Sequence, residues 1–181
     1  VMGPMATPFY IDMGFTLTEI GAVVKVVALI ASIIGIFVGG LLIQKIKIFR
    51  SLLIGALLVM VTNMLFAYVA ITEKNIISLA SIVAMDSLAA GIVGTINIAF
   101  LTSLVSKKYT AFQYALLTGF MTLPGFILKG LSGVWVETFQ SLYGFEFGWM
   151  SFYIVTSSLT IPSILLLYFN RAFMQKHENT L

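Results

Sequence analysis

The sequence predicts an all-α membrane protein, and three observations lead to this prediction. Apolar residues make up 60% of the 181 residues and charged residues only 9%, whereas a soluble domain carries about 25% charged residues. The apolar residues form long runs, most of them reaching the roughly 20 residues that a helix needs to cross a bilayer. Short polar segments separate these runs. We therefore expect a transmembrane helix bundle over residues 1–170 and a polar, cytoplasmic tail over residues 171–181.

We expect one partial span followed by five complete ones. Residues 1–11 are apolar but cover only about half a crossing. The complete spans are expected at about 19–43, 51–72, 76–106, 111–136 and 148–169. Thr18 and Ser51 stand where helix N-caps are expected, and Pro124 and Pro162 should bend the spans that contain them.

The charges between the spans predict the orientation in the membrane. Basic residues gather in alternate connections and in the tail: Lys45, Lys47, Arg50, Lys107, Lys108, Arg171 and Lys176. The other connections hold one cation among acids: Asp12, Glu19, Glu73, Lys74, Glu137 and Glu146. Since basic loops stay in the cytoplasm, the basic segments should be cytoplasmic. The net charge of +3 then reflects orientation, and we expect no nucleic-acid partner.

Charged residues inside the spans mark the candidate site. An ionised side chain in hydrocarbon is costly unless it faces protein or water, so each is a functional-site hypothesis. Lys25, Asp86 and Lys129 should lie in one layer, about 10 to 16 Å below the outer surface at 1.5 Å per helical residue. They either line an aqueous cavity, as a substrate or proton pathway, or Asp86 and Lys129 merely pair to hold two helices together. Asn97, on the same span as Asp86, is a fourth candidate for the pathway.

Neutral residues predict packing and the limits of the membrane. The spans at 51–72 and 148–169 carry no charge, so we expect them to support the bundle from the lipid side. Small residues that allow close helix packing occur in three pairs. These pairs are Gly35 with Gly39, Ser87 with Gly91, and Gly130 with Gly133. An interfacial aromatic belt is expected from Trp135, Tyr143, Trp149 and Tyr153.

The sequence offers no catalytic constellation, metal site or cofactor site. It contains no cysteine, and its one histidine, His177, lies in the polar tail, so a thiolate metal site and a histidine mechanism inside the membrane are excluded. Asp12 lies near the surface, far in depth from Asp86, so no pair of facing carboxylates is expected. The glycines form no phosphate-binding loop of a βαβ unit. We therefore expect a protein that is not an enzyme.

Four sequence motifs carry a resemblance that extends through nearly the whole chain. They are "DMGFTLTEIG", "IFRSLLI", "YTAFQYALL" and "GVWVE", in this order. They resemble the second half of AmpG-type muropeptide permeases of the major facilitator superfamily. The resemblance implies the C-terminal six-helix half of a twelve-helix transporter, with five full transmembrane helices and a truncated first one, and we expect further sequence upstream of Val1.

The resemblance also implies a function. It implies proton-driven import of anhydro-muropeptides for cell-wall recycling, across a bacterial inner membrane and together with an N-terminal six-helix half. Asp86 matches an acidic position of the family, and Lys129 lies a few positions after a basic one. Lys45, Lys47 and Arg50 fall in the cytoplasmic gating loop, where Gln44 replaces an acid. The alternatives are a non-transporting membrane remnant or scaffold, and a transporter of another substrate such as acetyl-CoA.

Overall fold

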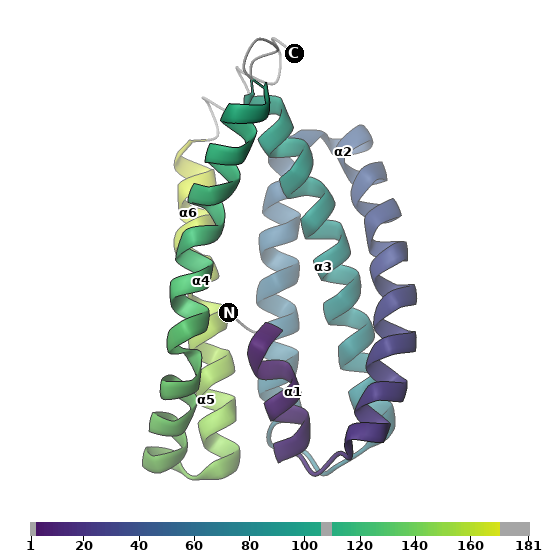
Figure 1. Ribbon diagram of the computed structural model, residues 1–181, viewed down its shortest axis with the longest axis vertical. Helices are drawn as coiled ribbons and strands as arrows, with labels where there is room; N and C mark the ends of the chain where they lie inside the picture. The colour runs from purple at the N-terminus through teal and green to yellow at the C-terminus, as the bar shows by residue number, and fades with distance from the viewer. Residues whose placement is uncertain (1–2, 106–109, 171–181) are drawn as a thin grey trace.

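The computed structural model describes residues 3–105 and 110–170, and all regular structure within them is helical (Figure 1). The helices are α1 (Gly3–Asp12), α2 (Leu17–Val69), α3 (Ile76–Leu104), α4 (Thr110–Tyr143), α5 (Phe145–Ser158) and α6 (Thr160–Phe169). α2, α3, α4 and the continuous stretch of α5 and α6 are each long and apolar enough to cross a membrane. The predicted all-α membrane fold is therefore confirmed. The predictions for Lys107, Lys108, Arg171, Lys176 and His177 lie outside the described residues.

α2 doubles back on itself at Lys47, which has a positive φ of 68°. Figure 1 shows the resulting two arms, residues 17–46 and 48–69, joined at the top of the view. The connection expected over residues 44–50 is thus a kink at one residue. The Ser51 hydroxyl donates a hydrogen bond to the Lys47 carbonyl at 2.8 Å. Ser51 therefore holds the kink, and the prediction that it is an N-cap is wrong.

The N-cap of α2 is Thr16, two residues before the predicted Thr18. The Thr16 hydroxyl accepts a hydrogen bond from the Glu19 backbone N–H at 3.2 Å. The Glu19 carboxylate in turn accepts one from the Thr16 backbone N–H at 2.8 Å. This reciprocal pair is a capping box, which satisfies two backbone donors that the first helical turn leaves free.

The last two spans differ from their expected bounds, and proline accounts for the break in the second of them. α4 contains Pro124 and continues to Tyr143, about two turns past Glu137. The final span divides into α5 and α6 at Leu159, three residues before Pro162. Proline removes one helical hydrogen bond and its ring crowds the carbonyl four residues earlier, which is consistent with the break at this point.

The first arm of α2 and α3 pack at very close range through glycine. A Cβ added at Gly35 would collide with the Leu88 carbonyl oxygen, and one at Gly91 with that of Ser32. A Cβ at Gly39 would lie 2.9 Å from the Ile92 carbonyl oxygen. Gly130 and Gly133 of α4 have nothing within 4 Å of such a Cβ. The close-packing prediction thus holds for α2 and α3, whereas the small face of α4 packs against no described residue.

Aromatic side chains fill the core between α1, α2 and α5. Phe9, Phe66, Trp149 and Tyr153 are all at most 1% exposed. The Phe9 ring lies 5.2 Å from that of Trp149 and 5.1 Å from that of Tyr153, both edge to face. The prediction that Trp149 and Tyr153 belong to an interfacial belt is therefore wrong, because both rings are buried. Tyr143, which is 60% exposed, remains compatible with such a belt.

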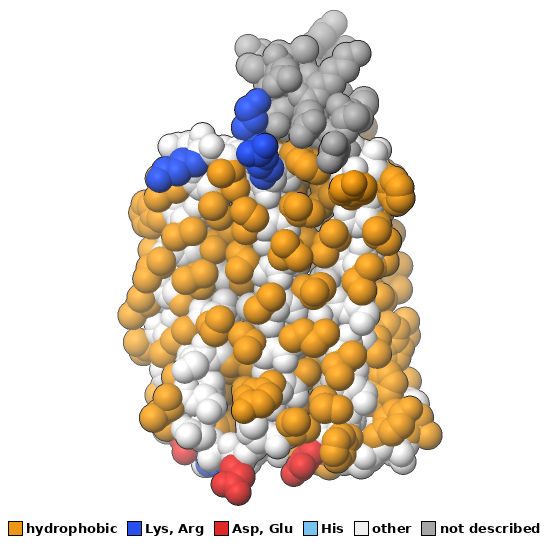
Figure 2. All heavy atoms as spheres, turned by 180° about the vertical axis from the view of Figure 1, so that it is seen from behind, with side chains coloured by type: hydrophobic (Ala, Val, Ile, Leu, Met, Phe, Trp, Pro, Cys, Tyr) orange, Lys and Arg blue, Asp and Glu red, His pale blue; other side chains and the backbone are white. Residues whose placement is uncertain are grey.

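Charges collect at the two ends of the bundle, and apolar side chains cover its sides (Figure 2). The exposed Lys45, Lys47 and Arg50 lie at the kink of α2. At the opposite end, the Lys74 ammonium binds the Gly14 carbonyl at 2.8 Å and the Glu19 carboxylate at 3.2 Å. These contacts join the α1–α2 and α2–α3 connections at one end of the molecule.

Candidate functional site

A cavity of about 480 Å³ opens beside Asp86, and we call it the Asp86 cavity. Its walls come from the second arm of α2, from α3, from α4, and from α5 and α6 with the residue between them. The lining residues are Val59, Thr62, Asn63, Asp86, Ala89, Ala90, Val93, Leu128, Lys129, Thr156, Leu159, Thr160 and Ser163. The structure thus brings Asp86 and Lys129 to one site, as the layer argument predicts.

The polar groups of the Asp86 cavity fall into two sets. The hydroxyls of Thr62 and Thr156 donate to backbone carbonyls of their own helices, and that of Thr160 donates to the Ser157 carbonyl at the end of α5, so they are already satisfied. The Asp86 carboxyl and the Asn63 amide make no side-chain hydrogen bond within residues 3–105 and 110–170. Buried polar groups are normally paired with protein or ordered water. The Asp86 carboxyl and the Asn63 amide, together with the Ser163 hydroxyl and the Lys129 ammonium, are therefore the groups of this cavity that a proton, water or substrate could engage.

Asp86 and Lys129 line the same cavity without forming an ion pair in the described part of the chain, in contrast to Lys74 and Glu19. Asp86 is half-buried, whereas Lys129 is exposed. The Lys129 ammonium lies 5.7 Å from the centre of the Phe126 ring, a cation–π distance. The described geometry therefore gives no support to the alternative in which these two charges hold helices together.

Lys25 lies apart from this site. It is exposed on the first arm of α2 and lines neither the Asp86 cavity nor the apolar one of about 530 Å³ between the two arms and α3. The structure therefore does not bring Lys25 together with Asp86 and Lys129.

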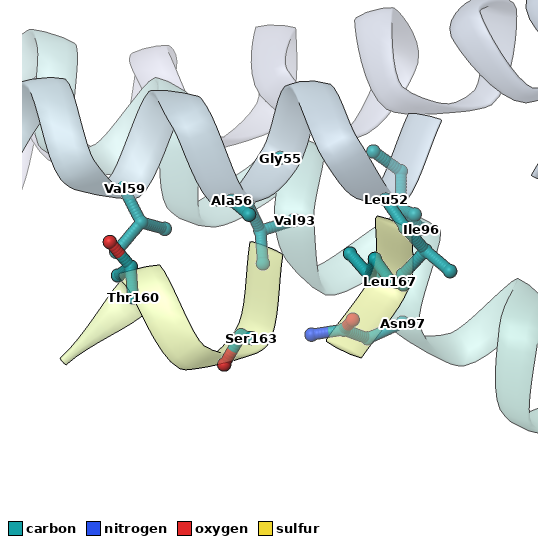
Figure 3. A pocket seen from close by; sticks show the side chains of 10 residues that line it. All are labelled: Leu52, Gly55, Ala56, Val59, Val93, Ile96, Asn97, Thr160, Ser163 and Leu167. Atoms are coloured by element: carbon teal, nitrogen blue, oxygen red, sulfur yellow. The ribbon is translucent and has the colours of Figure 1, made fainter. Parts of the chain in front are cut away.

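Asn97 lines a second cavity of about 290 Å³ that adjoins the first. The two cavities share Val59, Val93, Thr160 and Ser163. Figure 3 shows the Asn97 side chain from α3 and the Ser163 hydroxyl from α6 on the same side of this cavity. Asn97 is also about three helical turns from Asp86. Asp86 and Asn97 therefore mark two levels of one groove between the second arm of α2, α3 and α6.

The proposed gating residues lie at the kinked end of α2, far from Asp86 along the bundle. Lys45, Lys47 and Arg50 are all exposed there, and the positive φ of Lys47 sets the direction in which the second arm leaves. Phe49, buried beneath them at 8% exposure, anchors the kink to the bundle. Their gating role stays a prediction.

Two spans were expected only to support the bundle from the lipid side, at 51–72 and 148–169. Both contribute residues to the Asp86 cavity. Asn63, only 4% exposed, comes from the span at 51–72, and Thr156 and Ser163 come from the last span. The prediction that these spans only support the bundle is wrong for these faces. A single neutral amide in an apolar helix, such as Asn63, is the signal that could have revealed these cavity-lining faces, because polar groups inside a membrane need partners.

Three curated relatives match nearly all of the chain. The putative transporter AmpG 1 of Rickettsia prowazekii is 31% identical over 163 residues, which are 90% of this chain and 35% of that protein. The putative transporter AmpG 4 of Rickettsia felis is 30% identical over 172 residues, 94% of this chain and 40% of that protein. The anhydromuropeptide permease of Escherichia coli is 30% identical over 164 residues, which are 90% of this chain and 32% of that protein. No protein-family model matches the chain.

The long apolar helices define a multi-pass helical membrane protein. Its curated relatives carry the names AmpG and anhydromuropeptide permease, which confirms the resemblance to AmpG-type permeases that the four motifs indicate. The chain spans 32 to 40% of the length of the relatives described above.

Proposed function

We propose that this chain forms the C-terminal part of a proton-driven permease that imports anhydro-muropeptides across a bacterial inner membrane. The observation that carries the proposal is the Asp86 cavity. It holds a carboxyl, an ammonium group and neutral polar side chains, inside a bundle whose sides are apolar. The name of the Escherichia coli relative supplies the substrate class.

The chemistry of the cavity suits a glycopeptide. Peptide carboxylates would meet the Lys129 ammonium, and sugar hydroxyls would meet the Asn63 amide and the Ser163 hydroxyl. Asp86, with no ion pair in the described residues, is free to gain and lose a proton. Protonation of Asp86 would remove a charge whose burial is costly. Because of this cost, binding of the proton would be coupled to binding of the substrate.

The proposal includes an N-terminal half as partner. Lys129 is exposed, and no described residue lies within 4 Å of a Cβ placed at Gly130 or Gly133, so this part of α4 presents an ammonium and a smooth backbone to whatever lies beside it. A second bundle placed there would close the cavity against lipid. The chain alone should therefore insert into the membrane without transporting.

An uptake assay tests this proposal. Cells without an anhydromuropeptide permease would express this chain together with the part of the Escherichia coli relative that it leaves uncovered, and labelled anhydro-muropeptide would be the substrate. We expect uptake that needs both parts, stops with a protonophore and is not reduced by acetyl-CoA. Two parts that co-purify without uptake would favour the scaffold alternative, and competition by acetyl-CoA would favour another substrate.

A further inference from the structure

Tyr153 of α5 carries a hydroxyl that lacks a partner in the described residues. Its side chain is 0% exposed, and its hydroxyl oxygen makes no hydrogen bond there. The ring packs on Phe9 and Phe66, with both centroid distances 5.1 Å. Phenylalanine would fill the same space without leaving a polar atom unpaired, and an unpaired polar group buried away from water destabilises the fold. The hydroxyl therefore calls for an explanation beyond packing.

The position of Tyr153 relates it to Asp86. Thr156, one helical turn away on α5, lines the Asp86 cavity. Ile82 and Val83, about one turn before Asp86 on α3, belong to the same buried cluster as Tyr153. Ile82 and Asp86 are four residues apart on α3, so their side chains lie on the same face of that helix. Tyr153 thus belongs to the buried cluster that includes the turn of α3 before Asp86, whose carboxyl has no hydrogen-bond partner in the described residues.

We propose that Tyr153 is a positioning residue for Asp86, whose hydroxyl donates a hydrogen bond to the ionised carboxylate, directly or through one water in the cavity. A phenolic O–H can donate to a carboxylate, which when ionised only accepts. The hydrogen bond forms when Asp86 loses its proton and is released when Asp86 gains it. This inference deepens the proposed function. Only the role of the hydrogen bond in transport rests on that function.

The other titratable groups around Asp86 are few. Tyr10 of α1, 5% exposed, belongs to the same buried cluster as Tyr153. Lys129 faces the cavity from α4, and the second arm of α2 contributes the neutral Thr62 and Asn63. A cation in the same cavity would also favour an ionised carboxylate, so the test must separate Tyr153 from Lys129 and Tyr10.

Chemical labelling of Asp86 tests the proposal on the full chain, without transport. Dicyclohexylcarbodiimide, an apolar reagent, labels protonated carboxyls inside membranes, and mass spectrometry would give the labelled fraction of Asp86 at each pH. A donor to the ionised form favours that form. In Tyr153→Phe the labelling should therefore persist to higher pH, by about one unit. Tyr68→Phe, at a 65% exposed tyrosine on α2, is the matched control and should follow the wild type.

The comparison with Tyr10→Phe and Lys129→Met assigns the effect. We expect the shift of Tyr153→Phe to persist in the Lys129→Met background and to exceed that of Tyr10→Phe. Superimposable profiles for wild type and Tyr153→Phe would overturn the proposal. A negative uptake assay would leave the labelling profiles unaffected. Failure of the proposed function and failure of this inference are therefore distinguishable.

A second measurement covers the case in which Tyr153→Phe does not fold. Infrared difference spectra between low and high pH would be recorded with ring-labelled tyrosine in the wild type and in Asp86→Asn. We expect a tyrosine C–O band that changes with pH near the labelling midpoint in the wild type and is absent in Asp86→Asn. A wild type without such a band would overturn the proposal.

Discussion

Two acids of this chain show how the surroundings of a residue decide its role. Glu19 caps α2 and binds Lys74, so its charge is used within the fold. Asp86 has neither a hydrogen bond nor an ion pair in the described residues and faces a cavity. A charge that contributes nothing to its own fold inside a membrane is best explained by function.

Thr16→Ala tests the cap that the sequence misplaced. Removing the Thr16 hydroxyl leaves the Glu19 backbone N–H without its partner, and loss of an N-cap costs about 1 kcal/mol. Thr18→Ala, two residues on at an exposed position, should cost less than about 0.5 kcal/mol. Equilibrium unfolding of the detergent-solubilised chain would measure both. Equal losses would contradict the capping box.

Asp86→Asn separates function from packing at the residue that matters most. Breaking a buried ion pair costs about 3–5 kcal/mol, but Asp86 makes none in the described structure. The yield of monodisperse protein should therefore stay close to that of the wild type. A large fall in yield that Lys129→Met restores would show that the two charges are partners after all.

At the scale of the elements, the packing of α2 on α3 depends on glycine. Gly35 and Gly91 allow the two backbones to touch, and Gly39 extends this contact by one turn. Such a contact fixes the first arm of α2 against α3, while the second arm of α2, α5 and α6 form the opposite wall. The Asp86 cavity therefore lies on the side of α3 away from its tightest contact.

Gly35→Ala should loosen this contact, because its new methyl group would collide with the Leu88 carbonyl. Overpacking of this kind costs about 1–3 kcal/mol. Gly40→Ala, on the same arm with nothing within 4 Å of its Cβ, is the matched control and should be neutral or slightly stabilising. Thermal unfolding in detergent distinguishes them, and equal midpoints would contradict the close packing of α2 on α3.

Hydropathy predicts the helices of this chain better than it predicts their faces. The apolar runs identify every long helix, and Asp86 is identified as a candidate because one acid in an apolar run is unusual. Asn63 and Thr156 were missed because a neutral polar residue is a weak signal in such runs. The estimate of depth groups Lys25 with Asp86, but depth along a helix does not say which way a side chain points. Trp149 and Tyr153 resemble a belt in sequence and are buried through contacts with residues far away in the chain, such as Phe9 and Phe66.

At the scale of the whole molecule, the ends of the bundle differ in charge. The end at Lys47 carries cations, and the end at Gly14 and Lys74 carries mainly acids. Since the sequence contains no cysteine, single cysteines can report sidedness. In intact cells, a membrane-impermeant maleimide should label Lys74→Cys and Glu146→Cys but not Lys45→Cys. External labelling of Lys45→Cys would contradict the proposed orientation.

The central claim is that the Asp86 cavity serves transport. Its most direct test is proton-driven uptake of anhydro-muropeptide by the assembled permease, comparing the wild type with Asp86→Asn combined with Lys129→Met. The double variant keeps the fold and removes both charges of the cavity, so we predict normal assembly and loss of uptake by about tenfold or more. Uptake equal to that of the wild type would contradict the claim.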